Sequence, residues 1–203
     1  MQNKAKQKGI HMFKIITSLL LFLFFTSSYA QDNLILTKLY ENDQNSRKVK
    51  QIDWNNLLKQ DSIRRVKVLQ LIKENKLSTS NDFFHAAMIF QHGNDSISYK
   101  LAWKYSKKAS KIDTSNKSAR WLSAASYDRY LLSIGKPQIY GTQFLVFKKK
   151  YYLRNFDTTK VSDTERIYYS TRTLKEIEKF LESRNGEDEG LLMVPKNLKI
   201  IVK

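Results

Sequence analysis

The sequence predicts one mainly α-helical domain, a bundle of antiparallel helical hairpins with a small β element and a further helix after Gly141. Three observations support this fold class. Apolar residues recur at helical spacing almost without a break from residue 33 to Gly135. Only two prolines occur in 203 residues, and neither interrupts those segments. Beyond Gly141 the composition shifts toward aromatic and β-branched residues, which favour strands.

The first 30 residues are predicted to be a secretory signal peptide and not part of the domain. A lysine precedes an apolar run from Ile15 to Phe25, and small residues suited to cleavage after Ala30 follow it. The run is much shorter than the roughly 20 residues that span a bilayer, which disfavours the alternative of a membrane anchor. We therefore expect an exported, periplasmic or secreted protein that begins at Gln31 without a transmembrane anchor. Met12 is an alternative start.

Five helices are predicted between the cleavage site and Gly135. They cover about residues 33–50, 53–75, 80–93 and 96–112, and a stretch from the Thr114–Ser115 cap to Gly135. Asp53 is a suitable N-cap, and Gly93 suits the end of the third helix.

Small residues at Ala102, Ala109 and Ala119 resemble the junction between two tetratricopeptide-type units. No second copy recurs at a 34-residue period, so the pattern predicts similar hairpin packing without a repeat array.

The chain beyond Gly141 is predicted to hold a short hairpin and further helical segments. The stretch 142–156 has the composition of a hairpin, and Ser162 to Glu165 form a capping box that opens a helix. A last helix covers about residues 173–185 and ends at Gly186. The single domain is thus expected over residues 31–186, followed by a flexible acidic link and a tail over residues 187–203.

Charge and cysteine content restrict the possible partners. The net charge is +17, and residues 1–30 hold four lysines and no acids, so the remaining chain carries +13. This excess favours anionic partners such as acidic glycans or phosphorylated lipids. Nucleic-acid binding is disfavoured, because the lysines are scattered and no arginine-rich run with interleaved aromatics occurs. The absence of cysteine excludes disulfides and a lipid-bearing cysteine.

Three predicted helices each place a carboxylate on their apolar stripe. Asp43 and Arg47 continue the stripe of the first helix, Asp61 and Arg65 lie in that of the second, and Asp128 lies in that of the fifth. The apolar residues of these stripes are Leu36 and Tyr40 in the first helix, Trp54, Leu58, Val68, Leu69 and Ile72 in the second, and Trp121, Ala125 and Leu132 in the fifth. Buried carboxylates need partners. The stripes therefore predict either salt bridges and a cap that hold the helices in register, or a polar pocket where the three helices meet.

The helix over residues 80–93 carries both histidines of the expected mature chain, His85 and His92. Their seven-residue spacing separates them by roughly 10 Å along the axis, too far for one metal ion. No metal site and no cofactor are therefore predicted. Either histidine is a candidate base. The alternatives are a solvent-facing His85 beside Asp82 and a His92 that caps the helix end.

The segment DRYLLSIGKPQIYGTQF, residues 128–144, concentrates polar side chains just after a predicted helix end. Gly135 ends the helix, Pro137 stiffens the exit and Gly141 permits a tight turn. We therefore expect the loop to fold back, so that the end of the helix lies close to the side chains of Gln138, Tyr140, Thr142 and Gln143. They form either part of a site or a well-bonded loop that locks the two halves of the chain together.

Several active-site motifs are missing. The sequence has no G-x-S-x-G elbow, no H-E-x-x-H, no phosphate-binding glycine loop and no nucleophilic cysteine. The common hydrolase and nucleotide-binding classes therefore lose most of their support.

Five segments resemble, in order, an uncharacterised family of bacterial proteins, a domain of unknown function. They are LYENDQNSR at 39–47, DSIRR at 61–65, NDFFHAAMIFQHG at 81–93, RWLSAASYDRYLLSIGKPQIYGTQF at 120–144 and VSDTER at 161–166. The most specific patterns are A-A-M-x-F-Q-H-G and D-R-Y-L-x-x-x-G-K-P-Q-x-Y-G-T-Q. The resemblance covers about residues 34–184 and implies one domain without implying a reaction. Its pattern includes Asp43, Gln44, Arg47, Asp61, Arg65, Gln91, His92, Asp128, Arg129, Gln138, Tyr140, Gly141, Thr142 and Gln143.

We hypothesise a site for a small polar or anionic ligand, with hydrolysis as the candidate reaction and His92 or Asp128 as the base. The expected ligand-binding residues are Arg47, Arg65, Gln91, Arg129, Gln138, Tyr140, Thr142 and Gln143. In its strongest form, the hypothesis places His92, Asp128 and the loop residues in one pocket. The alternative is a non-catalytic helical-hairpin interaction module that binds an envelope component. It predicts dispersed or fully paired polar residues and an exposed apolar or aromatic groove elsewhere.

Overall fold

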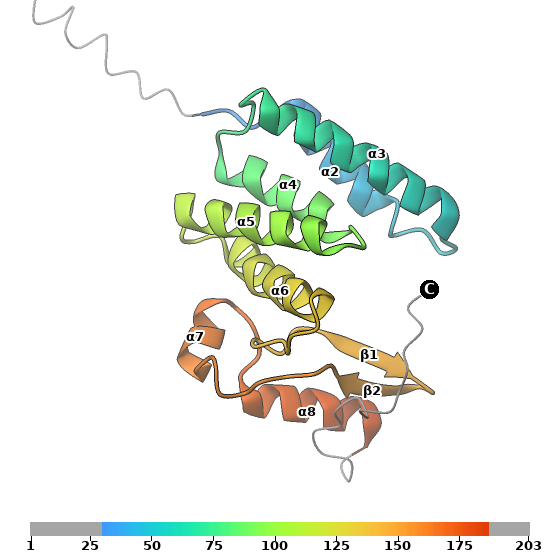
Figure 1. Cartoon of the computed structure of the whole chain (residues 1–203), viewed down its shortest axis with the longest axis vertical. Helices are drawn as coiled ribbons and strands as arrows, with labels where there is room; N and C mark the ends of the chain where they lie inside the picture. The colour runs from blue at the N-terminus through green and yellow to red at the C-terminus, as the bar shows by residue number, and fades with distance from the viewer. Residues whose placement is uncertain (1–29, 187–203) are drawn as a thin grey trace, which may run out of the picture. The chain divides into compact units, whose positions relative to one another are not determined.

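The computed structural model describes residues 30–186, which from Asp32 onward belong to one compact unit. It is mainly helical with a two-stranded antiparallel sheet, as predicted (Figure 1). The elements are α2 (Leu34–Asn45), α3 (Trp54–Lys73), α4 (Ser80–Gln91), α5 (Ser96–Ile112), α6 (Lys117–Ser133), β1 (Phe144–Phe147), β2 (Lys150–Leu153), α7 (Asp163–Tyr168) and α8 (Leu174–Asn185). The predicted signal peptide and the tail over residues 187–203 lie outside the described residues. Within residues 30–186, no helix has the length and apolarity needed to cross a membrane.

Side-chain caps fix where the helices begin. Asp53 caps α3 as predicted, and its carboxylate accepts a hydrogen bond from the N–H of Asn56 at 3.1 Å. Asn116 caps α6, in place of the expected Thr114–Ser115 cap. The first helix is shorter than predicted, because the chain turns after Asn45 and carries Arg47 back toward α3.

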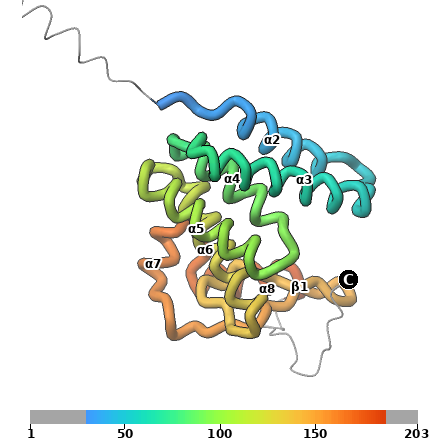
Figure 2. Tube along the Cα trace, turned by 45° about the horizontal axis from the view of Figure 1, so that its top comes forward, coloured from blue at the N-terminus to red at the C-terminus, as the bar shows by residue number. Residues whose placement is uncertain are grey.

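Helices α4, α5 and α6 pack in sequence order, and α2 and α3 both pack on α4 (Figures 1 and 2). The predicted small residues Ala102, Ala109 and Ala119 are fully buried. Between α5 and α6, the hydroxyl oxygens of Ser106 and Ser126 lie 3.4 Å apart. Small side chains on facing helices allow this close approach. The main core contains Leu36, Val68, Phe83, Ile89, Phe90 and Leu122.

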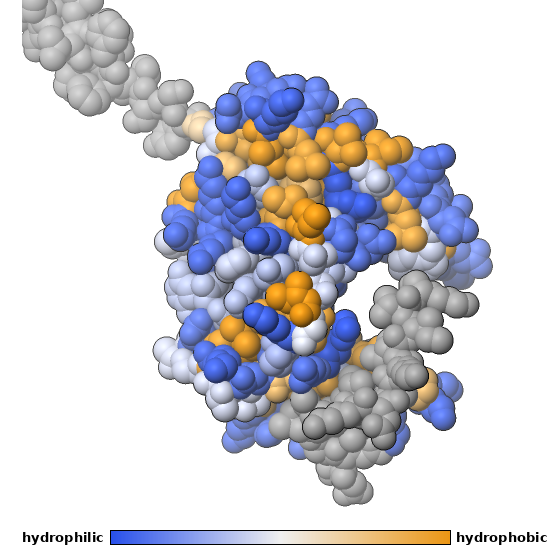
Figure 3. Space-filling model, in the orientation of Figure 1, coloured by the Kyte–Doolittle hydropathy of each residue, from blue (hydrophilic) through white to orange (hydrophobic). Residues whose placement is uncertain are grey.

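The predicted apolar stripe of α3 is only partly correct. Val68 and Asp61 are buried as predicted, but Trp54, Leu58 and Leu69 are 63%, 52% and 46% exposed. The full buried set is Leu57, Asp61, Arg64, Val68 and Leu71, an arc turned by about 70° from the predicted stripe on the helical wheel. Apolar residues occupy both arcs, so the wheel alone could not select the buried one. Hydrophobic residues accordingly gather at the surface over the upper helices in Figure 3.

The predicted hairpin after Gly141 is confirmed. Strand β1 pairs antiparallel with β2, with Phe144 opposite Leu153 and Phe147 opposite Lys150. The turn residues Lys148 and Lys149 have φ of 48° and 66°, the left-handed conformation that tight two-residue hairpin turns require. Helix α8 covers β2, and Leu153, Ile177 and Leu181 form a small separate core. Ser162 caps α7 as expected, but Glu165 does not complete a capping box and instead accepts a hydrogen bond from Tyr140.

Candidate functional site

Asp128, on α6, holds the loop that follows this helix. Its Oδ1 accepts hydrogen bonds from the N–H groups of Ile139 at 2.8 Å and Tyr140 at 3.0 Å. Its Oδ2 accepts from the N–H of Thr142 at 3.0 Å and from the hydroxyl of Thr142 at 2.7 Å. Burial raises the pKa of Asp128, although the four hydrogen bonds act in the opposite direction. The carboxylate is fully buried with both oxygens occupied, so the geometry does not support the expected role as a base.

Two of the expected ligand-binding residues are engaged within the fold. Gln138 is fully buried; its Nε2 donates to the carbonyls of Gln143 and Arg154 at 2.9 Å, and its Oε1 accepts from the N–H of Gln143 at 2.8 Å. The buried Tyr140 hydroxyl donates to Glu165 at 2.8 Å, and burial raises the pKa of Tyr140. These contacts correct the expectation for Gln138 and Tyr140. Their side chains hold the loop together and are not available to a ligand.

Arg129 is the charged residue that this loop orients. Its Nε donates to Gln143 Oε1 at 3.0 Å, and its Nη1 donates to the carbonyl of Gln91 at 3.0 Å. The Gln143 amide is itself fixed, because its Nε2 donates to the Thr142 hydroxyl at 2.9 Å. The buried Oε1 of Gln91 has no hydrogen-bond partner. Arg129 therefore connects the loop to the end of α4 through the Gln91 backbone.

A polar pocket of about 500 Å³ lies against Arg129 and Gln143. Its lining comes from the start of α5, the end of α6 and the hairpin, and comprises Asn94, Asp95, Ser96, Tyr99, Arg129, Leu132, Ser133, Gln143, Phe144 and Arg154. Two guanidinium groups, those of Arg129 and Arg154, thus share one pocket. Burial lowers the pKa of Arg129, and the charge of Arg154 lowers it further, whereas Tyr99 acts in the opposite direction.

No acid within residues 30–186 forms an ion pair with either guanidinium group of this pocket. Asp95 is the only acid in the lining, and it caps α5. Its carboxylate accepts from the N–H and the hydroxyl of Ser98, both at 2.8 Å. The lining therefore carries two positive charges and one negative charge, which leaves a net charge of +1.

The other predicted polar residues form a buried ion network between α2, α3 and α4. Arg47 bridges the two acids, with Nη1 2.8 Å from Asp43 and Nη2 2.6 Å from Asp61. Asp61 is paired on its own helix with Arg64, at 2.7 Å, and not with Arg65 as predicted. Arg65 instead points its Nη1 toward the carbonyl of His92, at 3.5 Å.

His92 closes this network at the end of α4. Its Nδ1 lies 2.9 Å from Asp43 Oδ2. A carboxylate at this position orients the ring and favours the tautomer with its proton on Nδ1, leaving Nε2 as an acceptor. His92 thus keeps the geometry of an oriented base. The predicted residues come together in two groups, one around Asp43 and His92 and one around Asp128 and Arg129, joined where Arg129 contacts the Gln91 carbonyl.

His85 is packed and not solvent-facing. Its ring stacks on Tyr40 with centroids 4.2 Å apart, and its buried Nδ1 has no hydrogen-bond partner. Thr79 caps α4, and the carboxylate of Asp82 completes the capping box by accepting the N–H of Thr79 at 3.1 Å; it also accepts the N–H of Asn33 at 2.7 Å. Burial lowers the pKa of His85 below its usual 6.5, against the opposing effect of nearby acids that include Asp32.

This burial makes the stability of the protein sensitive to acid. As the pH falls through 6.5, the unfolded chain binds a proton at His85 that the folded chain resists. The free energy of unfolding should therefore decrease as the pH falls, until it passes the lowered pKa of the folded state. Urea titrations at several pH values between about 7.5 and about 5 should show a smaller decrease in the free energy of unfolding for His85→Phe than for the wild type. An equal decrease in the free energy of unfolding for both proteins would show that His85 does not cause the acid sensitivity.

Sequence reasoning missed Arg64, Tyr99 and Arg154. Arg64 shares the seven-residue spacing of Leu57 and Leu71, so a signal was present in the sequence. No sequence signal indicated Tyr99 or Arg154, because the two residues line the same pocket only once the hairpin packs near α5 and α6.

Comparisons with protein-family models, with curated proteins and with solved structures found no match. The resemblance to an uncharacterised bacterial family stays a prediction.

Proposed function

We propose that the protein binds a small anionic ligand, through a carboxylate or phosphate group, in the pocket between Arg129 and Arg154. The observation that carries this proposal is the pair of guanidinium groups in one pocket of about 500 Å³, with no acid of residues 30–186 paired to either. Two like charges brought together in a partly desolvated site destabilise each other. An anion between them offsets this repulsion and forms charge-assisted hydrogen bonds, for which guanidinium groups are well suited.

The surroundings support a preorganised site. Arg129 is held by Gln143 and by the Gln91 carbonyl, so little side-chain entropy remains to be lost on binding. Tyr99 and Ser96, at the start of α5, add hydroxyl groups and a helix N-terminus to the lining. The negative charge of the Asp95 carboxylate offsets the positive potential of this helix N-terminus. The two guanidinium groups therefore provide the main attraction for an anion.

Binding is better supported than hydrolysis. The pocket lining contains no histidine, the Asp128 carboxylate is occupied by the loop, and the His92 ring belongs to the ion network around Asp43. Binding an anionic ligand and fixing its orientation require only the groups that line the pocket.

Replacing Arg154 by glutamine should weaken the binding of inorganic phosphate or citrate about tenfold or more, because one charge-assisted contact is lost. The Arg154 side chain forms no hydrogen bond or ion pair that supports the fold within residues 30–186, so the variant should keep its thermal midpoint. Isothermal titration calorimetry checks the affinity. Lys149→Gln, which removes one positive charge from the exposed hairpin turn, should bind as the wild type does. Equal affinities of Arg154→Gln and Lys149→Gln would contradict the proposal.

One observation favours the interaction module as a second candidate. The outward face of α5 lines a shallow groove of about 570 Å³, formed by Ile97, Lys100, Leu101, Trp103, Lys104 and Lys107. Ile97 is 72% exposed. This is the kind of exposed apolar groove that the alternative predicts, and its lysines suit an acidic envelope component. If Arg154→Gln binds phosphate as the wild type does, this face becomes the stronger candidate.

A further inference from the structure

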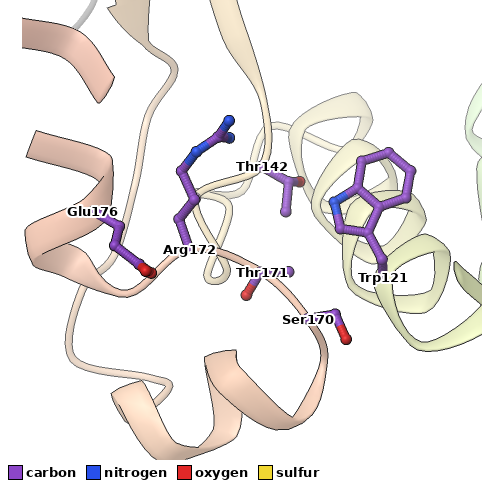
Figure 4. Close-up of a pocket in the computed structure, with 7 residues that line it drawn as sticks. Trp121, Thr142, Ser170, Thr171, Arg172 and Glu176 are labelled. Atoms are coloured by element: carbon purple, nitrogen blue, oxygen red, sulfur yellow. The ribbon is translucent and has the colours of Figure 1, made fainter. Parts of the chain in front are cut away.

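A second pocket, of about 440 Å³, lies beside the same loop (Figure 4). Gly141 and Thr142 of the loop line it, together with Trp121 from α6 and a segment that leads into α8. This segment contributes Ser170, Thr171, Arg172 and Glu176. None of these four residues belongs to the arginine pocket, so the two pockets can be tested separately.

Trp121 corrects a prediction and defines the character of this pocket. The helical wheel placed it in the core, but it is 43% exposed. No aromatic ring and no cation of residues 30–186 stacks on its indole. The indole stands on one side of the pocket and Arg172 and Glu176 on the other, with Thr142 and Thr171 between them (Figure 4). A flat apolar ring thus faces a set of polar groups across an open space.

The polar groups leave capacity for a ligand. Glu176 Oε2 accepts from the N–H and the hydroxyl of Thr173 at 2.7 and 2.9 Å, which fixes the carboxylate. Arg172 lies over the Phe180 ring at 4.3 Å and forms no ion pair with an acid of the described residues. Arg172 supplies donors and Glu176 an acceptor, and the two charges balance within the pocket.

The backbone holds these groups in place. Gly141 has φ of +75°, and a Cβ there would lie 2.5 Å from Ile177 Cδ1 of α8. Only glycine allows the loop to approach α8 this closely. Thr142 is fixed in turn by its two hydrogen bonds to Asp128. The loop and the start of α8 therefore form a preformed wall opposite Trp121.

We propose that this pocket binds a neutral sugar ring, as a monosaccharide or as one residue of a glycan. A pyranose has an apolar C–H face that can stack on an indole, and hydroxyl groups at its edge that both donate and accept hydrogen bonds. Arg172 and Glu176 match these hydroxyl groups. An anion would meet the Glu176 carboxylate, and a purely apolar ligand would leave both charged groups without partners. A nucleobase can also stack on an indole and is an outcome of the test.

The test is a titration of the full protein with methyl β-glucoside, N-acetylglucosamine, cellobiose and, as the nucleobase alternative, adenosine, followed by NMR and by tryptophan fluorescence. At least one sugar should bind saturably, and Trp121→Ala should weaken that binding about tenfold or more. Trp121→Phe should retain part of it. Trp54→Ala, which removes an indole that is 63% exposed on α3, is the matched control and should bind as the wild type does.

Three results would overturn the proposal. They are saturable binding of adenosine without binding of any sugar, binding of none of the ligands, and an affinity that Trp121→Ala leaves unchanged. Because Trp121 is 43% exposed and no ring of residues 30–186 stacks on it, the circular dichroism spectrum of Trp121→Ala should match that of the wild type, and its thermal midpoint should fall by a few degrees at most. The Arg154→Gln variant should bind the sugar normally. Failure of the sugar proposal is therefore distinguishable from failure of the anion proposal.

Discussion

Asp61→Ala should destabilise the protein by about 3–5 kcal/mol, because it leaves the buried Arg64 with only the more distant carboxylate of Asp43, at 3.8 Å, and removes one of the two carboxylates paired with Arg47. Asp61 accepts from Arg47 at 2.6 Å and from Arg64 at 2.7 Å, and its side chain is almost completely buried. Arg64 is also buried, so water cannot replace the lost acceptor at little cost. The free energy of unfolding from urea titration measures the effect.

Two variants test the assignment of partners. Arg65→Ala should change the stability by less than about 1 kcal/mol, because within residues 30–186 Arg65 forms no ion pair with Asp61 and its hydrogen bond, to the carbonyl of His92, is long at 3.5 Å. The double variant Asp61→Ala with Arg64→Leu should recover part of the loss, because it removes an uncompensated charge together with its partner. A loss on Arg65→Ala as large as that on Asp61→Ala would contradict the network.

Asp128→Ala should also cost on the order of 3 kcal/mol or more, because three backbone N–H groups and one hydroxyl lose their acceptor. The same change should weaken phosphate binding, because the loop carries Gln143, which orients Arg129. Asp157→Ala is a suitable control: this acid lies in a loop and accepts only from Thr159 among the described contacts, so its loss should be small. A stable Asp128→Ala protein with unchanged phosphate affinity would show that the carboxylate does not hold the loop.

The sequence predicted the helices well because local signals determine them. Caps such as Asp53, small residues such as Ala102 and the glycine at 135 act over a few residues, and the structure has them where expected. The burial of Asp43 and Asp128 was also predictable, since Asp43 follows the buried Leu36 on its helix face and Asp128 follows the buried Ala125 on its own.

The partners of these acids were harder to predict because they come from distant segments. Asp128 is satisfied by backbone groups at 139–142, and backbone donors leave no trace in the sequence. The prediction for α3 was inaccurate for a different reason. Apolar residues cover more than one side of that helix, and a small rotation of the buried side exchanges Arg65 for its neighbour Arg64. Arg154 enters the pocket only through the pairing of β2 with β1.

A crystal structure of the protein soaked in sodium phosphate shows whether the two arginines form an anion site. We expect one phosphate within hydrogen-bond distance of both Arg129 and Arg154, and no phosphate there in the Arg154→Gln variant. Phosphate bound only at exposed lysines, with the pocket between the two arginines occupied by water alone, would contradict it.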